Sequence, residues 1–317
     1  MTVAVRPAMA SDDDLAAIVR IVNAASPEDG TSVADLRWAD ATYPGIVRFI
    51  ADLEGHPVGA ATVGRIYMYP PEFDAFWATI DVLLGARRQG IGGSLLAAAA
   101  ASAAAAGKTH LHIPTTADRP DAVAFLERRG FLEYERTRAV RLELAGRARA
   151  ADDPPDGIEL TDLAARPDLV AGVLAVALEA FLDLPGGDRP MAAGELAEFR
   201  ARDVDRPGIP PDAFGVAVER VGGVVVGYAA LMLKPGDPTV GLHDMTAVAR
   251  AWRRRGLAGA LKRRTIGWAI DHGLTALETG NDEGNHAMQG VNARLGYRPL
   301  PDLLTMRGPL DRAMMTW

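Results

Sequence analysis

The chain contains no cysteine among its 317 residues, and this absence removes several kinds of chemistry at once. Without thiols it can form no disulfide, hold no thiolate-bound metal and use no cysteine nucleophile. Any acyl chemistry would therefore have to use another nucleophile or none. No metal site is expected.

Long apolar runs and basic clusters are also lacking. The longest apolar stretch, residues 95–106, is mostly alanine and is shorter than the about 20 residues that cross a bilayer. The first residues, MTVAVRPAMASDDD, have neither the basic start nor the apolar segment of a signal peptide. The net charge is −7, and no basic run alternates with aromatic residues. We expect a cytoplasmic protein with no membrane or nucleic-acid partner.

The length favours two domains of roughly 150 residues each. A hydrophobic fraction of 49% with 24% charged residues is typical of soluble globular proteins, so both domains can have packed cores. Residues 145–157, AGRARAADDPPDG, lack periodicity and are typical of a linker. We place the first domain at residues 1–148, the linker at 149–157 and the second domain at 158–317.

One pattern occurs twice, as ARRQGIGGSLL at residues 86–96 and WRRRGLAGALK at residues 252–262. In each copy a buried strand, at 77–84 or 240–248, precedes the pattern, and a helix follows it. An offset of 166 positions relates Arg87 to Arg253, Gly90 to Gly256, Val82 to Val248, Gly107 to Gly273, Gly130 to Gly296 and Phe131 to Tyr297. Each half therefore has the same order of strands and helices, which predicts an α/β fold with a mixed sheet flanked by helices.

A strand that ends in a glycine-rich turn and continues as a helix presents backbone N–H groups at the positive end of that helix, a geometry that binds phosphate. Glycine or alanine lets the backbone approach the anion, at Gly90, Gly92, Gly93, Gly256, Ala258 and Gly259. With arginines beside each turn, a diphosphate is the natural ligand. Tight turns with solvated arginines are the alternative, but duplication in register favours binding.

Other phosphate motifs fit the sequence less well. The dinucleotide pattern GxGxxG fails, because Leu95 occupies the place of its third glycine counted from Gly90. The stretch Gly107–Thr109 has Ser102 where a P-loop needs its first glycine, and it follows a helix where a P-loop opens one.

The strand, the RxxGxG or RxxGxA turn and the helix resemble the acetyl-CoA site of the GNAT N-acyltransferase superfamily. The endings FLERRGF (125–131) and VNARLGY (291–297) are similar to the last helix of that family and the strand after it. The resemblance covers nearly the whole chain as two GNAT modules, an arrangement similar to tandem mycothiol-synthase-type enzymes of actinobacteria. It implies an acyltransferase made of two tandem GNAT folds, with acetyl-CoA as cofactor.

The resemblance implies that the strand before each turn splays from its neighbour and admits the pantetheine arm, and that an amine then attacks the thioester directly. The backbone that would bind pantetheine lies at Asp81, Val82, Leu83, Ala247, Val248 and Ala249. The residues that would bind the diphosphate are Arg87, Arg88, Gln89, Gly90, Ile91, Gly92, Gly93 and Ser94 in the first half, and Arg253, Arg254, Arg255, Gly256, Leu257, Ala258 and Gly259 in the second.

An attacking ammonium must lose a proton near neutral pH, so a base is needed. Asp244 is our preferred base, on a strand face that we expect it to share with Thr246; His243, on the other face, is the reserve. Asp81 and Asp118 are the candidates in the first half. A solvated or capping role is an open alternative for all four.

Three asparagines in ETGNDEGNHAMQGVN (278–292) add to the case for the second half, because an amide side chain can both donate to and accept from pantetheine. Asn281 and Asn285 are candidate cofactor ligands, although helix capping would also explain Asn285. Neither half has the family's common acid, a tyrosine, because Leu126 and Asn292 occupy its positions. Because the three asparagines lie in the second half, we hypothesise that the second half is catalytic.

The leading hypothesis is an acetyl-CoA-dependent N-acetyltransferase for the primary amine of a small molecule, acting as a monomer or homodimer. A non-catalytic acyl-CoA-binding sensor is the alternative that the missing tyrosines favour, and a dinucleotide enzyme is a weaker third. Residues 183–212, rich in proline and glycine, are expected to form a substrate lid or an irregular connection.

Overall fold

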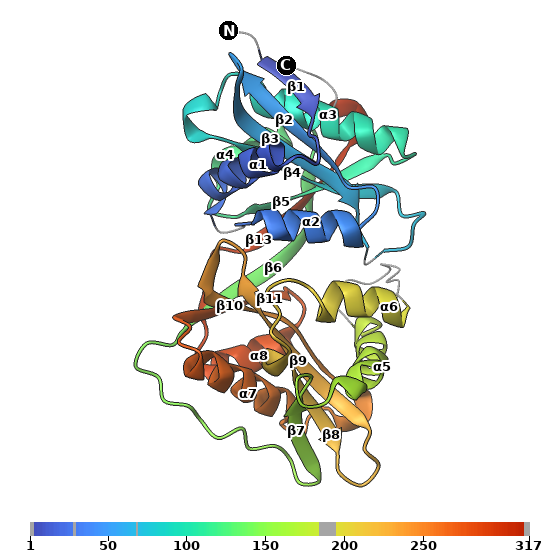
Figure 1. Ribbon diagram of the computed structural model, residues 1–317, viewed down its shortest axis with the longest axis vertical. Coiled ribbons are helices and arrows are strands. Elements are labelled where there is room, and N and C mark those ends of the chain that lie inside the picture. Colours follow the sequence, from blue (N-terminus) through green and yellow to red (C-terminus); the bar gives the residue numbers. More distant parts are fainter. Residues whose placement is uncertain (1–2, 28–29, 68, 184–194, 314–317) are drawn as a thin grey trace. The chain divides into compact units, whose positions relative to one another are not determined.

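The computed structural model describes residues 3–27, 30–67, 69–183 and 195–313, and it divides into two compact units (Figure 1). The first unit is Met1–Arg136 with Pro301–Trp317, and the second is Thr137–Leu300. The expected linker, residues 149–157, falls inside the second unit. Domain boundaries at 148 and 158 stay a prediction from the sequence repeat. Much of the expected lid, residues 184–194, lies outside the described residues.

The sheet of the first unit has the strand order β1-β2-β3-β4-β5-β13. Its strands are β1 (Val3–Pro7), β2 (Val47–Leu53), β3 (His56–Arg65), β4 (Ala75–Val82), β5 (His110–Thr116) and β13 (Leu303–Pro309). Only β4 and β5 are parallel, and the other neighbours are antiparallel.

Helices cover both faces of this sheet. They are α1 (Asp12–Ala25), α2 (Val33–Thr42), α3 (Ile91–Ala105), α4 (Pro120–Glu127) and α9 (Leu310–Ala313). The alternation of β3 shows the two faces, because Ala60 packs with Ile18 of α1 whereas Ala61 packs with Leu95 of α3. Helix α2, absent from the sequence-based expectations, begins with a capping box between Ser32 and Asp35.

The sheet of the second unit has the order β6-β11-β10-β9-β8-β7, with β12 beside β6. Its strands are β6 (Leu132–Glu143, from Thr137 onward), β7 (Ile158–Asp162), β8 (Gly215–Glu219), β9 (Val225–Lys234), β10 (Asp237–Val248), β11 (Ala276–Asp282) and β12 (Arg298–Pro299). Only β10 and β11 are parallel.

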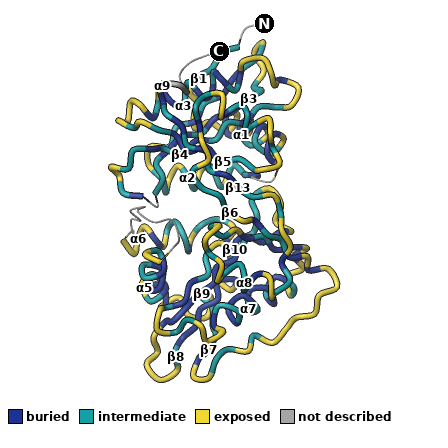
Figure 2. Tube along the Cα trace, turned by 180° about the vertical axis from the view of Figure 1, so that it is seen from behind, coloured by how far each residue is buried: buried dark blue, intermediate teal, exposed yellow. Residues whose placement is uncertain are grey.

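The helices of the second unit are α5 (Val170–Phe181), α6 (Leu196–Phe199), α7 (Leu257–Asp271) and α8 (His286–Leu295), with a π-helical turn at Arg200–Val204 after α6. Helices α5 and α7 pack on opposite faces, against Ala230 and Ala229 of β9 respectively. Residues Val225–Met232 of β9 are all buried, which Figure 2 shows as a continuous dark segment. A central strand covered on both faces is apolar throughout for this reason.

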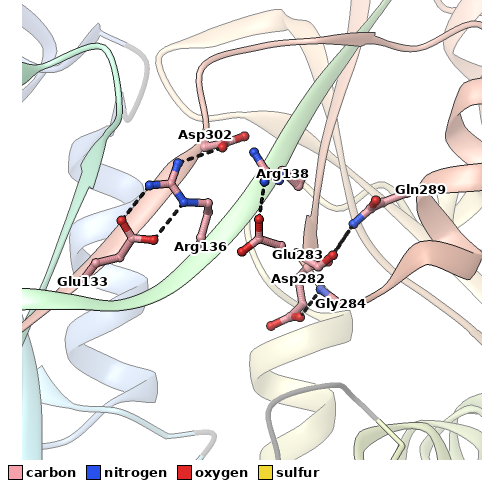
Figure 3. A network of polar contacts seen from close by, with 8 residues as sticks. All are labelled: Glu133, Arg136, Arg138, Asp282, Glu283, Gly284, Gln289 and Asp302. Atoms are coloured by element: carbon pink, nitrogen blue, oxygen red, sulfur yellow. Dashed lines mark hydrogen bonds and ion pairs between the residues drawn. The ribbon is translucent and has the colours of Figure 1, made fainter.

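The strand that closes each sheet comes from the other half of the sequence. The repeat places the strand after Phe131 at the end of the first half. In the structure, residues 137–143 of this strand, β6, pair with β11 of the second unit. The first unit is closed instead by β13, which pairs with β5 from Leu303 to Pro309. Within the first unit Arg136 donates to Glu133 and to Asp302 (Figure 3), which ties the start of β6 to the segment before β13.

No helix among the described residues is both long enough and apolar enough to cross a bilayer.

Gly308 of β13 offers a test of this closure. A Cβ atom at this position would lie 2.3 Å from Cγ of the fully buried Phe131, so Gly308→Ala must displace the ring. We expect it to lower the free energy of unfolding by about 1–3 kcal/mol, measured by urea denaturation. Gly85→Ala is the control, because no heavy atom lies within 4 Å of its added Cβ. Equal effects of the two changes would contradict the packing described.

Candidate functional site

The parallel strands of each unit pair over only three residues. In the first unit, Ala75–Trp77 of β4 pair with His110–His112 of β5. In the second, Val240–Leu242 of β10 pair with Ala276–Glu278 of β11. Beyond these residues β4 and β10 remain paired on their other side, with β3 and β9. The backbone that the resemblance assigns to pantetheine, near Val82 and Val248, therefore lies past the point where the strands separate.

The two arginine and glycine turns have the same conformation. Gly90 and Gly256 precede α3 and α7 with φ of 81° and 84°, values that glycine adopts readily. Neither helix receives a side-chain cap at its first turn. Arg87 Nε donates to the carbonyl of Val82 at 3.1 Å, and Arg253 Nε donates to that of Val248 at 2.8 Å. The structure thus places each predicted diphosphate loop directly at the end of its splayed strand, with backbone N–H groups at the helix start.

The surroundings of the two loops differ. In the first unit Phe125 and Arg129 of the α4 segment lie over the loop, because a Cβ at Gly92 would be 3.6 Å from the Phe125 ring and one at Gly93 would be 3.3 Å from Arg129 Nη2. The guanidinium of Arg129 stacks on the Phe125 ring at 4.0 Å. At Gly259 of the second loop only Arg263, from the same helix, comes as close.

The arginines at the second loop form hydrogen bonds with a carboxylate side chain. Asp183, just after α5, accepts from Arg250 Nη2 at 2.7 Å and from Arg253 Nη1 at 2.6 Å. Hydrogen bonds from both guanidinium groups hold the pKa of Asp183 well below its usual value. Glu179 of α5 also accepts from the backbone N–H of Arg250. The guanidinium groups at this end of β10 thus already bond to an anionic side chain of the protein itself.

Asp244 of β10 lies on the side of the sheet that faces α5 and the π-helical turn. Solvent reaches part of its side chain, yet the surrounding protein atoms desolvate the carboxyl and so raise its pKa. The charges of Arg206 and Arg202 oppose this effect. Asp203 of the π-helical turn also has a raised pKa, mainly through burial, and accepts from Arg202 Nε at 2.9 Å. The sequence did not point to this group of charges, because it comes from residues about 40 positions apart.

A β-bulge changes which residues share a face with Asp244. His243 pairs with Leu231 of β9, but Thr246 pairs with Ala229, so two residues, Asp244 and Met245, stand opposite one. Because of this extra residue, the side chain of Thr246 lies on the same face of the sheet as that of His243. The expectation that Asp244 and Thr246 share a face was therefore wrong, because it assumed unbroken alternation.

His243 is buried in the opposite face and is held by two hydrogen bonds. Its Nε2 lies 2.6 Å from Thr265 Oγ1, and its Nδ1 lies 2.7 Å from the hydroxyl of Tyr297. Because Thr265 donates its own proton to the carbonyl of Lys262, we assign the imidazole proton to Nε2 and the Tyr297 proton to the bond with Nδ1. Burial, together with the charge of Lys262, lowers the pKa of His243 well below its usual value. The ring is thus neutral and lies in the core, not beside Asp244.

A chain of polar groups leads from this core to the end of β11. Lys262 of α7 is only 1% exposed, and its Nζ donates to Asn292 Oδ1 at 2.8 Å. Asn292 Nδ2 donates in turn to Asn281 Oδ1 at 2.6 Å. Burial lowers the pKa of Lys262 to about 7. Sequence reasoning missed Lys262, although a lysine at the position equivalent to Leu96 on a core-facing helix was a usable signal.

The equivalent positions of the first unit are apolar. Counted by the same offset they are Leu96 for Lys262, Ala99 for Thr265, Leu126 for Asn292 and Phe131 for Tyr297, and all four belong to one buried cluster. The polar chain is therefore a property of the second unit.

Asn285 begins α8 as a capping residue, because its Oδ1 accepts from the backbone N–H of Met288 at 3.2 Å. Asp282 closes the preceding corner through a bond from the N–H of Gly284, and Gln289 Nε2 donates to the Asp282 carbonyl (Figure 3). The assignment of Asn285 as a cofactor ligand stays a prediction.

Asp81, the candidate of the first unit, is buried and forms part of a bridge. It accepts from Ser26 Oγ at 2.7 Å, at the end of α1. Arg119, at the start of α4, donates to Ser26 Oγ at 3.1 Å and to the Ala25 carbonyl at 2.6 Å. Side chains thus connect the end of β4 with the start of α4. Asp118 is exposed and accepts from Thr116 Oγ1 at 2.6 Å.

No group of three or more metal-ligating side chains occurs among the described residues.

Comparison with known proteins agrees with this geometry. The model of the Acetyltransferase (GNAT) family matches residues 15–131 and again residues 179–297. No curated protein matches the sequence.

Solved structures share the fold along the whole chain. A tandem GNAT protein from the clavulanic acid biosynthesis pathway has a TM-score of 0.77 at 23% identity, covering 98% of this chain and 99% of its own. A GCN5-related N-acetyltransferase from Sphaerobacter thermophilus has a TM-score of 0.72 at 17% identity, covering 97% and 96%. The two family matches and these likenesses confirm the expected pair of tandem GNAT folds. The chain belongs to the Acetyltransferase (GNAT) family and is an acyltransferase enzyme.

Proposed function

We propose that the protein transfers an acetyl group from acetyl-CoA directly to the primary amine of a small molecule, and that the second unit performs the reaction. The observation that carries this proposal is the place of Asp244. Its carboxyl stands on the bulge of β10, between the residues where β10 leaves β11 and the diphosphate loop at Arg253–Gly259.

The chemistry needs few protein groups. The amine nitrogen attacks the thioester carbonyl carbon, the C–S bond breaks, and CoA leaves as its thiolate, which takes up the proton that the nitrogen loses in becoming an amide. A free alkyl ammonium has a pKa near 10.4, so its proton must first be removed near neutral pH. Asp244 accepts that proton, directly or through a water molecule, and its raised pKa makes it a better base than an ordinary aspartate.

The cofactor would be held by this chain's own backbone. The N–H groups at the start of α7 and the arginines at 253–255 would bind the diphosphate, and acetyl-CoA would supply the activated acyl group. The unpaired side of β10 at Ala247 and Val248 would bind the pantetheine amides. Asp183 would have to release Arg253 when the diphosphate arrives.

Three differences support assigning turnover to the second unit. The first unit has the Asp81–Ser26–Arg119 bridge between the end of β4 and the start of α4. Phe125 and Arg129 lie over its loop. Its positions equivalent to the second unit's polar chain are apolar. We infer that the first unit has a structural role or binds CoA without turnover.

Asp244→Asn tests the assignment of the base. The amide has nearly the same shape but cannot take a proton, so we expect kcat to fall at least about 100-fold. The measurement is the release of free CoA thiol from acetyl-CoA in the presence of a panel of primary amines. Asp81→Asn and the exposed Asp118→Asn are the matched controls, and both should retain most of the activity. Loss of activity in Asp81→Asn alone would move the reaction to the first unit. Wild-type protein that binds CoA but releases no thiol with any amine would support the acyl-CoA sensor.

The pH profile gives a second test. Because the surrounding protein raises the pKa of Asp244, kcat/KM should begin to fall, as the pH is lowered, at a value above the ordinary 3.8 of aspartate. Protonation below that pH leaves the carboxyl unable to accept the amine proton. The profile is measured by thiol release over roughly pH 4–8. An acidic limb that is unchanged in Asp244→Asn would contradict the assignment.

A further inference from the structure

Lys262 is a costly residue for a protein core. It is 1% exposed, its amine bonds to Asn292 Oδ1, and its other contact is with the ring face of Tyr297 at 5.3 Å. No carboxylate is among these contacts to balance a charge. The equivalent Leu96 shows that the same helix position can be filled by a hydrocarbon side chain without such a cost.

The lysine fixes the direction of the amide chain. As an ammonium Lys262 can only donate hydrogen bonds, and as the neutral amine that a pKa of about 7 allows it still has two N–H donors against one lone pair. In the structure Asn292 accordingly turns its Oδ1 toward Lys262. The Nδ2 of Asn292 then faces Asn281, which must present its Oδ1 to receive that proton. The Nδ2 of Asn281, with its two N–H donors, is thereby left for a partner other than Asn292.

Asn281 stands where such a donor would be useful. It lies three residues beyond Glu278, the last residue of β11 that pairs with β10, and it is partly exposed. An acyl-pantetheine arm between the two strands has amide N–H donors and carbonyl acceptors, and each of its carbonyl oxygens could accept a hydrogen bond from Asn281 Nδ2. An Asn281 side chain turned the other way would present its oxygen, which could bond to an amide N–H of the arm but not to a carbonyl oxygen.

We propose that Lys262 is a positioning residue, which acts through Asn292 to make Asn281 a hydrogen-bond donor to a carbonyl oxygen of the acyl-pantetheine arm. This inference rests on the proposed function of the second unit. Asn292 occupies the position where the resemblance leads one to expect a tyrosine acid. The proposal gives Asn292 a role in binding the cofactor instead.

Lys262→Met tests the proposal, because methionine has a similar volume but no donor. Once the amide chain is free to reverse, we expect KM for acetyl-CoA to rise about tenfold, the effect of losing one hydrogen bond, with a smaller change in kcat. Asn281→Asp, which removes the donor directly, should raise KM by a similar factor. The double variant should be no worse than either single one, because both remove the same bond.

The matched control is Leu96→Met, the same residue at the equivalent position of the first unit, which should leave KM unchanged. Additive effects of Lys262→Met and Asn281→Asp, or an unchanged KM in Lys262→Met, would overturn the proposal. Failure of the proposed function is a separate result, because wild-type protein would then release no CoA thiol with any amine.

Stability measurements separate positioning from a structural role. Burial lowers the pKa of Lys262 from an ordinary 10.5 to about 7, so between these values the unfolded chain binds a proton that the folded chain does not. The free energy of unfolding of the wild type should therefore rise with pH over this interval. The two groups that face the amine titrate outside it, because the pKa of His243 is lowered and that of Tyr297 is raised, mainly by burial.

Lys262→Met should lack this rise and should be at least as stable as the wild type at neutral pH, measured by urea denaturation at a series of pH values. A variant that is less stable at neutral pH, with KM unchanged, would show that Lys262 serves the fold and would overturn the proposal.

Discussion

The separation of two parallel strands is the constraint on which the rest of the structure depends. Backbone N–H and carbonyl groups away from water require partners, yet β10 is paired with β11 over only three residues and continues to Val248 with β9 alone. A ligand with its own amides can satisfy the open side, as can water. After the point where β10 leaves β11, the chain passes through the bulge at Asp244 and the glycine turn at Gly256 to the start of α7.

The same backbone arrangement occurs in both units, so the side chains must account for any difference in function. In the first unit, hydrocarbon side chains fill the space between α3, α4 and the sheet, and the Ser26 bridge connects the strand end to α4. In the second, hydrogen-bonded groups fill it, from Thr265 and His243 to Asn281. A buried polar network adds little net stability unless every member is satisfied. Its presence in one unit alone is better explained by a requirement for oriented donors than by folding.

The sequence was informative where local geometry determines the structure. The two arginine and glycine turns were predictable because Gly90 and Gly256 adopt positive φ and the register of the repeat places them alike. The closing strands were not, because pairing Arg138 with Asn281, or Leu303 with Thr116, depends on contacts between residues far apart in the chain. The bulge could not be predicted for a similar reason, because an extra residue in β10 is recognised only from the pairing of β10 with β9. Lys262 lay in a segment already assigned to a helix, and its burial required knowing which face packs on the sheet.

The carboxylate of Asp183 shows how the same constraint acts on the loop. Four arginines, Arg250 and Arg253–Arg255, precede the positive end of α7 and repel one another, and an anion reduces that repulsion. Asp183 does so by bonding to Arg250 and Arg253. Because this ion pair is exposed, it contributes little free energy and can be exchanged for a diphosphate, which brings more charge to the same donors. In the proposed exchange Arg253 would be held in place, since its Nε is bonded to the Val248 carbonyl. The strand end thus orients the arginine, and the arginine determines where a phosphate can lie relative to the opening between β10 and β11.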